Sequence, residues 1–181
     1  MKPGLKKDAV GLTLDPNTLS SFVSLSEGNR KVEFVRHQPD PDHPHRFAGD
    51  PDVLSVESLT GRCYWEAQWS GDKACISVSY RGVIRNEDYG SGESDESWSL
   101  ECSKDGYMAF YGGCGIGRSD PPFNRVGVYL DWGSGTVSFY TISPNTHTLT
   151  HLRTFYNTFT EPLYAGLCVY PDSSASLCET E

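Results

Sequence analysis

The sequence lacks several features of membrane-spanning, secreted and nucleic-acid-binding proteins. No apolar run approaches the roughly 20 residues that a helix needs to cross a bilayer. The opening stretch "MKPGLKKDAVGL" has no apolar segment of the kind found in signal peptides. Basic residues are scarce, because 15 Lys and Arg accompany 24 Asp and Glu, for a formal net charge of -9. Since an acidic surface repels phosphate groups, we expect no nucleic-acid partner and no membrane contact by this domain.

The motifs of common catalytic and metal sites are absent as well. The sequence has no Gly-x-Ser-x-Gly and no Cys-x-x-Cys. The stretch "GGCGIG", residues 112–117, is superficially similar to a phosphate-binding glycine loop, but "RSDPPF" follows where a helix would have to begin. Three histidines and two aspartates between residues 37 and 45 are interrupted by prolines, and a solvated loop is the better interpretation. We therefore expect no catalytic residue, no metal and no cofactor.

The six cysteines stand far apart, at positions 63, 75, 102, 114, 168 and 178. Their even number permits three disulfides, but a chain of 181 residues buries a sizeable core without them. Four of them, Cys63, Cys75, Cys102 and Cys168, fall within predicted strands, where a thiol behaves as a small buried apolar group. There is also no Asn-x-Ser/Thr glycosylation site. These features favour free thiols, a reducing compartment and a cytoplasmic location.

What the sequence has in abundance is the alternation typical of β-strands. The clearest case is "RVGVYLDWGSGTVSFY", residues 125–140. Apolar side chains there occupy every second position: Val126, Val128 and Leu130, then Val137 and Phe139. Between the two runs, "DWGSG" supplies glycines that tolerate positive φ and an aspartate that can accept bonds from backbone amides. The stretch predicts an antiparallel hairpin.

Short runs of this kind recur along the whole chain. Thirteen candidate strands lie near residues 11–14, 22–25, 31–35, 53–56, 63–69, 74–80, 98–102, 107–111, 125–130, 136–141, 149–155, 163–169 and 175–178. Alternation assigns seven side chains of two of these strands to the core: Trp65, Ala67, Trp69, Ala74, Ile76, Val78 and Tyr80. With no convincing amphipathic helix, the pattern predicts an all-β fold, a two-sheet antiparallel sandwich.

Three segments break the strand pattern and are interpreted as loops. They are residues 36–52, rich in Pro, His and Asp; residues 85–97, acidic and rich in Gly and Ser; and residues 112–124, rich in Gly and Pro. Loops held on a rigid β scaffold commonly carry binding residues. Because no catalytic constellation is evident, these loops are the natural place to look for function.

Several motifs, in order and spacing, resemble the PRY–SPRY domain family. "LTLDPNTLSSFVSLSEGNRKVEF" resembles the PRY segment, and "GRCYWEAQW", "SWSLEC", "RVGVYLDWGSGTVSFY" and "FTEPLYAG" resemble successive SPRY motifs. The resemblance implies a PRY–SPRY domain over residues 8–179, with PRY from about 8 to 60 and SPRY from about 61 to 179, after a linker or extension at 1–7. It also implies a bent sandwich and a non-catalytic protein-interaction module.

The final stretch, residues 150–179, looks most like the domains of tripartite-motif proteins, NOD-like receptors and stonustoxin-type proteins. This resemblance implies the C-terminal targeting domain of an innate-immune or ubiquitin-ligase protein, with any ligase activity in a RING domain outside this chain. One alternative is the C-terminal domain of a stonustoxin-type pore-forming protein. Another is a sensor of small phosphorylated ligands, as in butyrophilin relatives, although acidic loops argue against that.

The resemblance also implies that ligands bind on one concave face. Carried over by position, that face includes Cys75, Glu101, Ser103, Tyr170 and loop residues from 36–49, 86–95 and 111–123. Several relatives carry tryptophans where this chain has Glu101 and Ser103, so the resemblance implies a more polar and acidic floor here.

Aromatic side chains near this face are the predicted contacts for a protein ligand, because a few aromatics dominate most interfaces. We select Tyr89, Tyr111, Phe123 and Tyr170. The alternative is that Tyr111 ends a core strand and Tyr89 is a solvated loop residue. An acidic group is expected to steer a ligand with a basic patch: Glu87, Asp88, Glu93 and Asp95. The isolated domain is expected to be a monomer.

Overall fold

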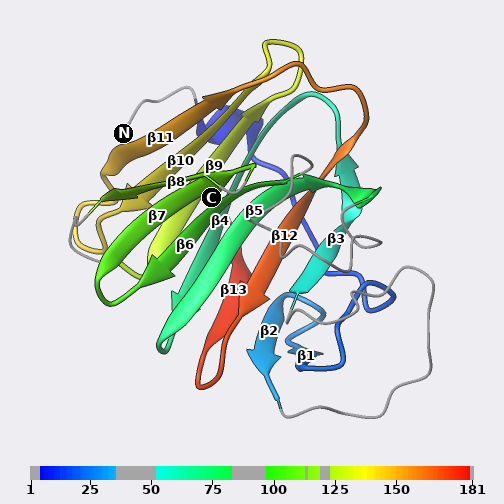
Figure 1. Ribbon diagram of the computed structural model, residues 1–181, viewed down its shortest axis with the longest axis vertical. Coiled ribbons are helices and arrows are strands. Elements are labelled where there is room, and N and C mark those ends of the chain that lie inside the picture. The colour runs from blue at the N-terminus through cyan, green and yellow to red at the C-terminus, as the bar shows by residue number, and fades with distance from the viewer. Residues whose placement is uncertain (1–4, 36–51, 83–96, 113, 119–122, 180–181) are drawn as a thin grey trace.

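The computed structural model is a sandwich of two antiparallel β-sheets (Figure 1). It describes residues 5–35, 52–82, 97–112, 114–118 and 123–179. A short 3-10 turn at Lys6–Asp8 precedes the strands. The first seven strands are β1 (Val23–Ser26), β2 (Lys31–Phe34), β3 (Asp52–Leu59), β4 (Arg62–Ser70), β5 (Lys73–Tyr80), β6 (Ser97–Ser103) and β7 (Gly106–Tyr111). The last six are β8 (Cys114–Arg118), β9 (Arg125–Asp131), β10 (Thr136–Ile142), β11 (Leu149–Tyr156), β12 (Leu163–Val169) and β13 (Ser174–Cys178).

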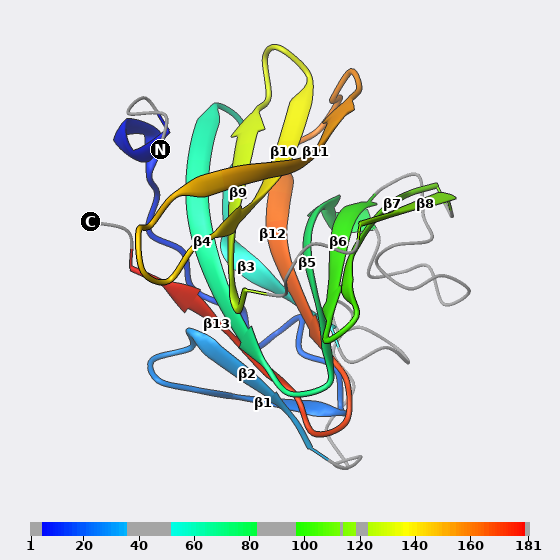
Figure 2. The same cartoon turned by 90° about the vertical axis from the view of Figure 1, so that its left-hand side faces the viewer.

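Seven strands form one sheet, in the order β1-β2-β13-β4-β9-β10-β11, and six form the other, in the order β3-β12-β5-β6-β7-β8. Figure 2 shows the two layers from the side, with β4, β9 and β10 in one and β5, β6 and β12 in the other. This arrangement confirms the two-sheet antiparallel sandwich that the alternation predicted. In the described part of the chain, no helix has the length and apolar character required to cross a membrane.

The core lies between the two sheets and contains the residues that alternation assigned to it. The seven predicted side chains of β4 and β5 all belong to it: Trp65, Ala67, Trp69, Ala74, Ile76, Val78 and Tyr80. The predicted hairpin is also confirmed, because β9 pairs with β10 and Val128 stands opposite Phe139. In its turn the backbone amide of Ser134 donates to the Asp131 carboxylate at 3.1 Å, as expected from "DWGSG".

The number of strands matches the prediction, but the set of strands does not. Residues 11–14 were expected to form a strand, and this is wrong, because the segment makes only an isolated bridge between Leu14 and Ser55. Leu12 and Leu14 are nevertheless buried in the core. The alternation therefore predicted the burial of these side chains correctly, but it predicted a strand where the segment forms only one bridge to β3.

The opposite error concerns residues 112–124, which were interpreted as a loop although Cys114–Arg118 form strand β8 at the edge of the six-stranded sheet. The glycines that masked this strand allow it to lie close to the side chains of β7. Gly115 stands opposite Phe110, and a Cβ added to Gly115 would lie 2.7 Å from the Phe110 ring. Strand pairing uses backbone groups, so a strand without apolar alternation still forms there.

The predicted positions of the cysteines are confirmed. Cys63, Cys75, Cys102 and Cys168 lie in strands and are buried. Cys114 is exposed and Cys178 is half-buried. All six lie in described residues and none is bonded to another.

Candidate functional site

The six-stranded sheet has one face in the core and a second face that we call the outer face. Because Ala74, Ile76, Val78 and Tyr80 of β5 point into the core, the residues between them point the other way. The same alternation in the neighbouring strands gives the outer face mainly small or hydroxylated side chains: Cys75, Ser77, Ser79, Ser97, Ser99, Glu101, Ser103, Met108, Phe110 and Cys168. Six of them are buried, namely Cys75, Ser77, Ser79, Ser97, Ser99 and Cys168. Among the described residues, the more exposed part of this face therefore lies at Glu101 and Met108, toward β7 and β8.

One register row runs across all six strands of this face. In sheet order its members are Asp52, Cys168, Cys75, Glu101, Met108 and Gly117. The row unites Cys75 and Glu101, both predicted site residues, and adds a second thiol and a methionine. Met108 was missed by the sequence analysis, although the alternation in "GYMAFY" sets it on the face opposite Tyr107 and Ala109.

A cavity of about 370 Å³ opens at one end of this row. Its lining residues come from β6, the β6–β7 turn, β7 and β8: Glu101, Ser103, Asp105, Gly106, Tyr107, Met108 and Gly117. Met108 is 40% exposed, and the Glu101 side chain is 27% exposed. The Ser103 hydroxyl accepts a hydrogen bond from the Asp105 amide at 3.3 Å. The cavity therefore combines an apolar thioether with two carboxylates.

Lys73 connects this cavity to Tyr170. Its ammonium lies 3.4 Å from the Glu101 carboxylate and 4.3 Å from the centre of the Tyr170 ring. Burial, followed by the nearby thiols of Cys168 and Cys75, raises the pKa of the Tyr170 hydroxyl well above its ordinary range. Tyr170 is consequently a neutral hydroxyl at physiological pH, and Lys73 partly neutralises Glu101.

The structure thus brings four predicted residues together at the outer face: Cys75, Glu101, Ser103 and Tyr170. Tyr111 does not join them. Its ring stacks on Trp98 of the core at 5.2 Å between centroids, and its hydroxyl accepts a hydrogen bond from the Asn157 amide at 2.9 Å. Tyr111 accordingly has the core-strand position that was the alternative interpretation.

Of the remaining predicted residues, Phe123 lies in the described part of the chain. Phe123 is half-buried, and its carbonyl accepts a hydrogen bond from the Tyr107 hydroxyl at 2.7 Å. Five predicted contact or steering residues lie outside the described residues: Tyr89, Glu87, Asp88, Glu93 and Asp95. The loops at 36–49 and 86–95 lie outside them as well.

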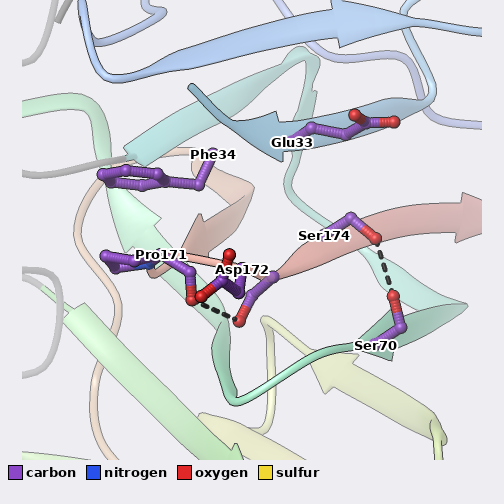
Figure 3. Close-up of a pocket in the computed structure, with 7 residues that line it drawn as sticks. Glu33, Phe34, Ser70, Pro171, Asp172 and Ser174 are labelled. Carbon is purple, nitrogen blue, oxygen red and sulfur yellow. Dashed lines mark hydrogen bonds between the residues drawn. The ribbon is translucent and has the colours of Figure 1, made fainter. Parts of the chain in front are cut away.

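A larger cavity, of about 580 Å³, opens at the end of the sandwich (Figure 3). Its lining residues come from the ends of β2 and β4, from the β12–β13 turn and from the first residue of β13: Glu33, Phe34, Ser70, Pro171, Asp172, Ser173 and Ser174. The hydroxyls of Ser70 and Ser174 are hydrogen-bonded at 2.8 Å, and the Glu33 carboxylate lies 3.2 Å from the Lys31 ammonium. No motif in the sequence pointed to this cavity, because its lining comes from three distant segments.

The turns around both cavities are joined to one another. The backbone amides of Asp72 and Lys73 both donate to the Ser173 hydroxyl at 3.0 Å, and Lys104 forms an ion pair with Asp72 at 3.3 Å. These contacts hold the β4–β5, β6–β7 and β12–β13 turns together at the lower end of Figure 1. Residues of these connected turns line both cavities.

Within the described ranges, no group of three or more His, Cys, Asp or Glu side chains is placed to hold a metal ion. The histidines between residues 37 and 45 lie outside those ranges.

Comparisons with known proteins agree with this architecture. The model of the SPRY-associated domain, PRY, matches residues 12–59, and the SPRY domain model matches residues 62–180. Stonustoxin subunit beta of Synanceia horrida is 37% identical over 87% of this chain and 23% of its own length. Tripartite motif-containing protein 16 of Mus musculus is 33% identical over 87% of this chain and 29% of its own length. The chain thus spans less than a third of these relatives.

Two solved structures show the same fold. A stonustoxin structure has a TM-score of 0.86 and 30% identity, covering 98% of this chain and 32% of that one. The TRIM65 PSpry domain has a TM-score of 0.86 and 26% identity, covering 97% of this chain and 93% of that one. The two family models and the shared sandwich lead to one conclusion: this chain belongs to the SPRY domain family, with the associated PRY segment at its N-terminal side.

Proposed function

We propose that this domain is a non-catalytic protein-interaction module that binds a protein ligand at the outer face of the six-stranded sheet. The observation that carries the proposal is the cavity between β6, β7 and β8, where Met108 and Glu101 stand side by side and partly exposed. Family membership supports a binding role, because SPRY domains generally act as interaction modules. Three predicted site residues, Cys75, Glu101 and Ser103, lie in or beside this cavity.

The chemistry of the cavity fits a basic side chain of the ligand. The alkyl stem of a lysine or arginine can pack on the Met108 thioether while its cationic end meets the carboxylates of Glu101 and Asp105. The net charge of -9 also attracts a basic partner at distances beyond the cavity itself. Because Lys73 already pairs with Glu101, we assign the steering of a basic ligand to the acidic surface as a whole.

We further propose that the parent is an innate-immune or ubiquitin-ligase protein acting in the cytoplasm, with this domain as its C-terminal targeting part. The identity of 37% to stonustoxin subunit beta favours a second candidate, the C-terminal domain of a stonustoxin-type pore-forming protein. Sequencing the transcript upstream of this domain distinguishes the two candidate parents by the domain that is encoded there. The acidic lining of the cavity, with Glu101 and Asp105, argues against a phosphorylated-ligand sensor.

The binding proposal is tested by quantitative capture with immobilised domains. Met108→Lys adds a positive charge in the cavity, and Tyr156→Lys adds the same charge on β11 of the other sheet, where the tyrosine is 79% exposed. We expect proteins retained by the unmodified domain to be lost from Met108→Lys and kept by Tyr156→Lys. Equal retention by all three domains would place the ligand elsewhere.

A further inference from the structure

Strands β5 and β12 place two cysteines opposite each other on the outer face. Cys75 and Cys168 are register partners in an antiparallel pair. Such partners have Cα atoms about 4.5–5.5 Å apart, within the roughly 4.4–6.8 Å that a disulfide spans. The two thiols lie within hydrogen-bonding reach of each other, and neither is in a disulfide.

The other four cysteines, all within the described residues, have no such partner. Their register neighbours are Leu130 for Cys63, Ala74 and Tyr107 for Cys102, Tyr111 for Cys114, and Glu66 for Cys178. The arrangement of Cys75 and Cys168 is therefore specific within the chain. Cys102 and Cys114 on the same six-stranded sheet serve as controls, because neither has a thiol opposite it.

Both thiols are buried and surrounded by polar groups. Asp52 on β3 and the Tyr170 hydroxyl lie within hydrogen-bonding reach of Cys168, and Glu101 on β6, paired with Lys73, stands opposite Cys75. The hydrogen bond with Cys75, then burial and the Asp52 charge, raise the pKa of the Cys168 thiol well above its ordinary value. The Cys168 thiol is therefore protonated at neutral pH, so its reaction with an oxidant is slow there and speeds up as the pH rises.

We propose that Cys75 and Cys168 form a redox modification site, where a small peroxide converts the two thiols into a disulfide that links β5 to β12. One thiolate attacks the peroxide, the O–O bond breaks, and a sulfenic acid and one water result. The second thiol attacks that sulfur, so that an S–S bond forms and the sulfenic oxygen leaves as a second water. The thiols lose two electrons, the peroxide gains them, and both thiol protons end in water.

The disulfide would join two distant parts of the chain in the same row as Glu101 and Met108. It would restrict the unfolded chain, so the oxidised domain should melt at a higher temperature than the reduced one. The site is independent of any ligand, and its test needs none.

The test uses the sequence positions of the trypsin sites. Cleavage after Lys73 and Arg81 releases Cys75 alone in peptide 74–81, and cleavage after Arg153 releases Cys168 with Cys178 in peptide 154–181. The folded domain carrying Cys114→Ser, which removes the exposed thiol, is treated with hydrogen peroxide, alkylated, digested and analysed by mass spectrometry. We expect a linked pair of these peptides that dithiothreitol separates.

Two further variants identify the sulfurs. The link should persist when Cys178→Ser is added and disappear when Cys168→Ser or Cys75→Ser is added instead. Recovery of both peptides as alkylated thiols or as sulfinic acids, at peroxide levels that modify Cys114 in the unmodified domain, overturns the proposal. So does a link that survives Cys168→Ser. The arms with and without Cys178→Ser contain both native thiols, so their results do not depend on the folding of a Cys75 or Cys168 variant.

Discussion

Replacing Glu66 with alanine should destabilise the domain more than any surface charge change on the same sheet. Glu66 is buried on β4, although it carries a carboxylate. The Tyr64 hydroxyl donates to it at 2.6 Å, and the Arg125 guanidinium contacts it at 2.7 Å through Nε and 2.6 Å through a terminal nitrogen. Gly127 stands opposite Glu66, and a Cβ there would lie 2.8 Å from the Tyr64 hydroxyl, so the Tyr64 ring packs closely against Gly127.

The size of the loss in the free energy of unfolding follows from the groups that lose their partner when Glu66 is replaced. The Tyr64 hydroxyl, in a fully buried residue, loses its partner, which costs about 1–3 kcal/mol. Arg125 is 34% exposed, so water replaces much of its lost pairing, and its share is about 1 kcal/mol. We expect Glu66→Ala to lower the free energy of unfolding by about 2–4 kcal/mol and Glu66→Gln by about half of that.

Urea unfolding followed by tryptophan fluorescence measures the effect. Glu33→Ala is the control, because its pair with Lys31 lies on the surface and should contribute less than about 0.5 kcal/mol. A double-mutant cycle with Tyr64→Phe should show a coupling of about 1 kcal/mol. If Glu66→Ala matches Glu33→Ala within error, the buried network does not stabilise the fold as reasoned.

Three further predictions concern stability. Trp65→Ala should lower the free energy of unfolding by about 3–5 kcal/mol, because the indole is buried between the sheets; an unchanged melting temperature would contradict this. Gly135→Ala should cost about 2–3 kcal/mol in denaturant titration, since Gly135 has a φ of 74° and a Cβ there would overlap the Asn157 carbonyl, whereas Gly133→Ala should have almost no effect. Burial and a carboxylate hydrogen bond raise the pKa of Tyr129 to about 12. In the unfolded chain the Tyr129 hydroxyl ionises at about pH 10, so its contribution to stability is present below about pH 10 and is lost as the pH rises toward 12. Tyr129→Phe should therefore lessen the fall in the urea midpoint between about pH 10 and 12, and an equal fall in both proteins would refute this.

Local patterns predicted the fold well where burial alternates along one strand. The hairpin at 125–140 and the core faces of β4 and β5 follow from the period of two, since each strand has one face in the core. The pattern failed at 11–14, where two buried leucines sit beside β3 in an irregular segment. It failed again at β8, whose glycines carry no apolar signal.

The candidate site was less predictable, because it depends on register between strands distant in sequence. The resemblance to known relatives pointed to Cys75, Glu101, Ser103 and Tyr170, and the fold brings these together. Cys168 was seen only as a buried thiol, since no local pattern shows that it faces Cys75 across 93 positions of sequence (168 − 75). Local alternation separates the two faces of a strand such as β7, but it does not show what lies against the face that points away from the core.

The central claim, that a protein ligand binds at the outer face of the six-stranded sheet, is tested most directly by amide hydrogen exchange. The domain is compared alone and in complex with a captured partner that Met108→Lys fails to retain. The account predicts slower exchange in Gly106–Tyr111 and Cys114–Arg118, the strands that line the cavity with Glu101. Protection confined to the seven-stranded sheet, with these two strands unchanged, would contradict it.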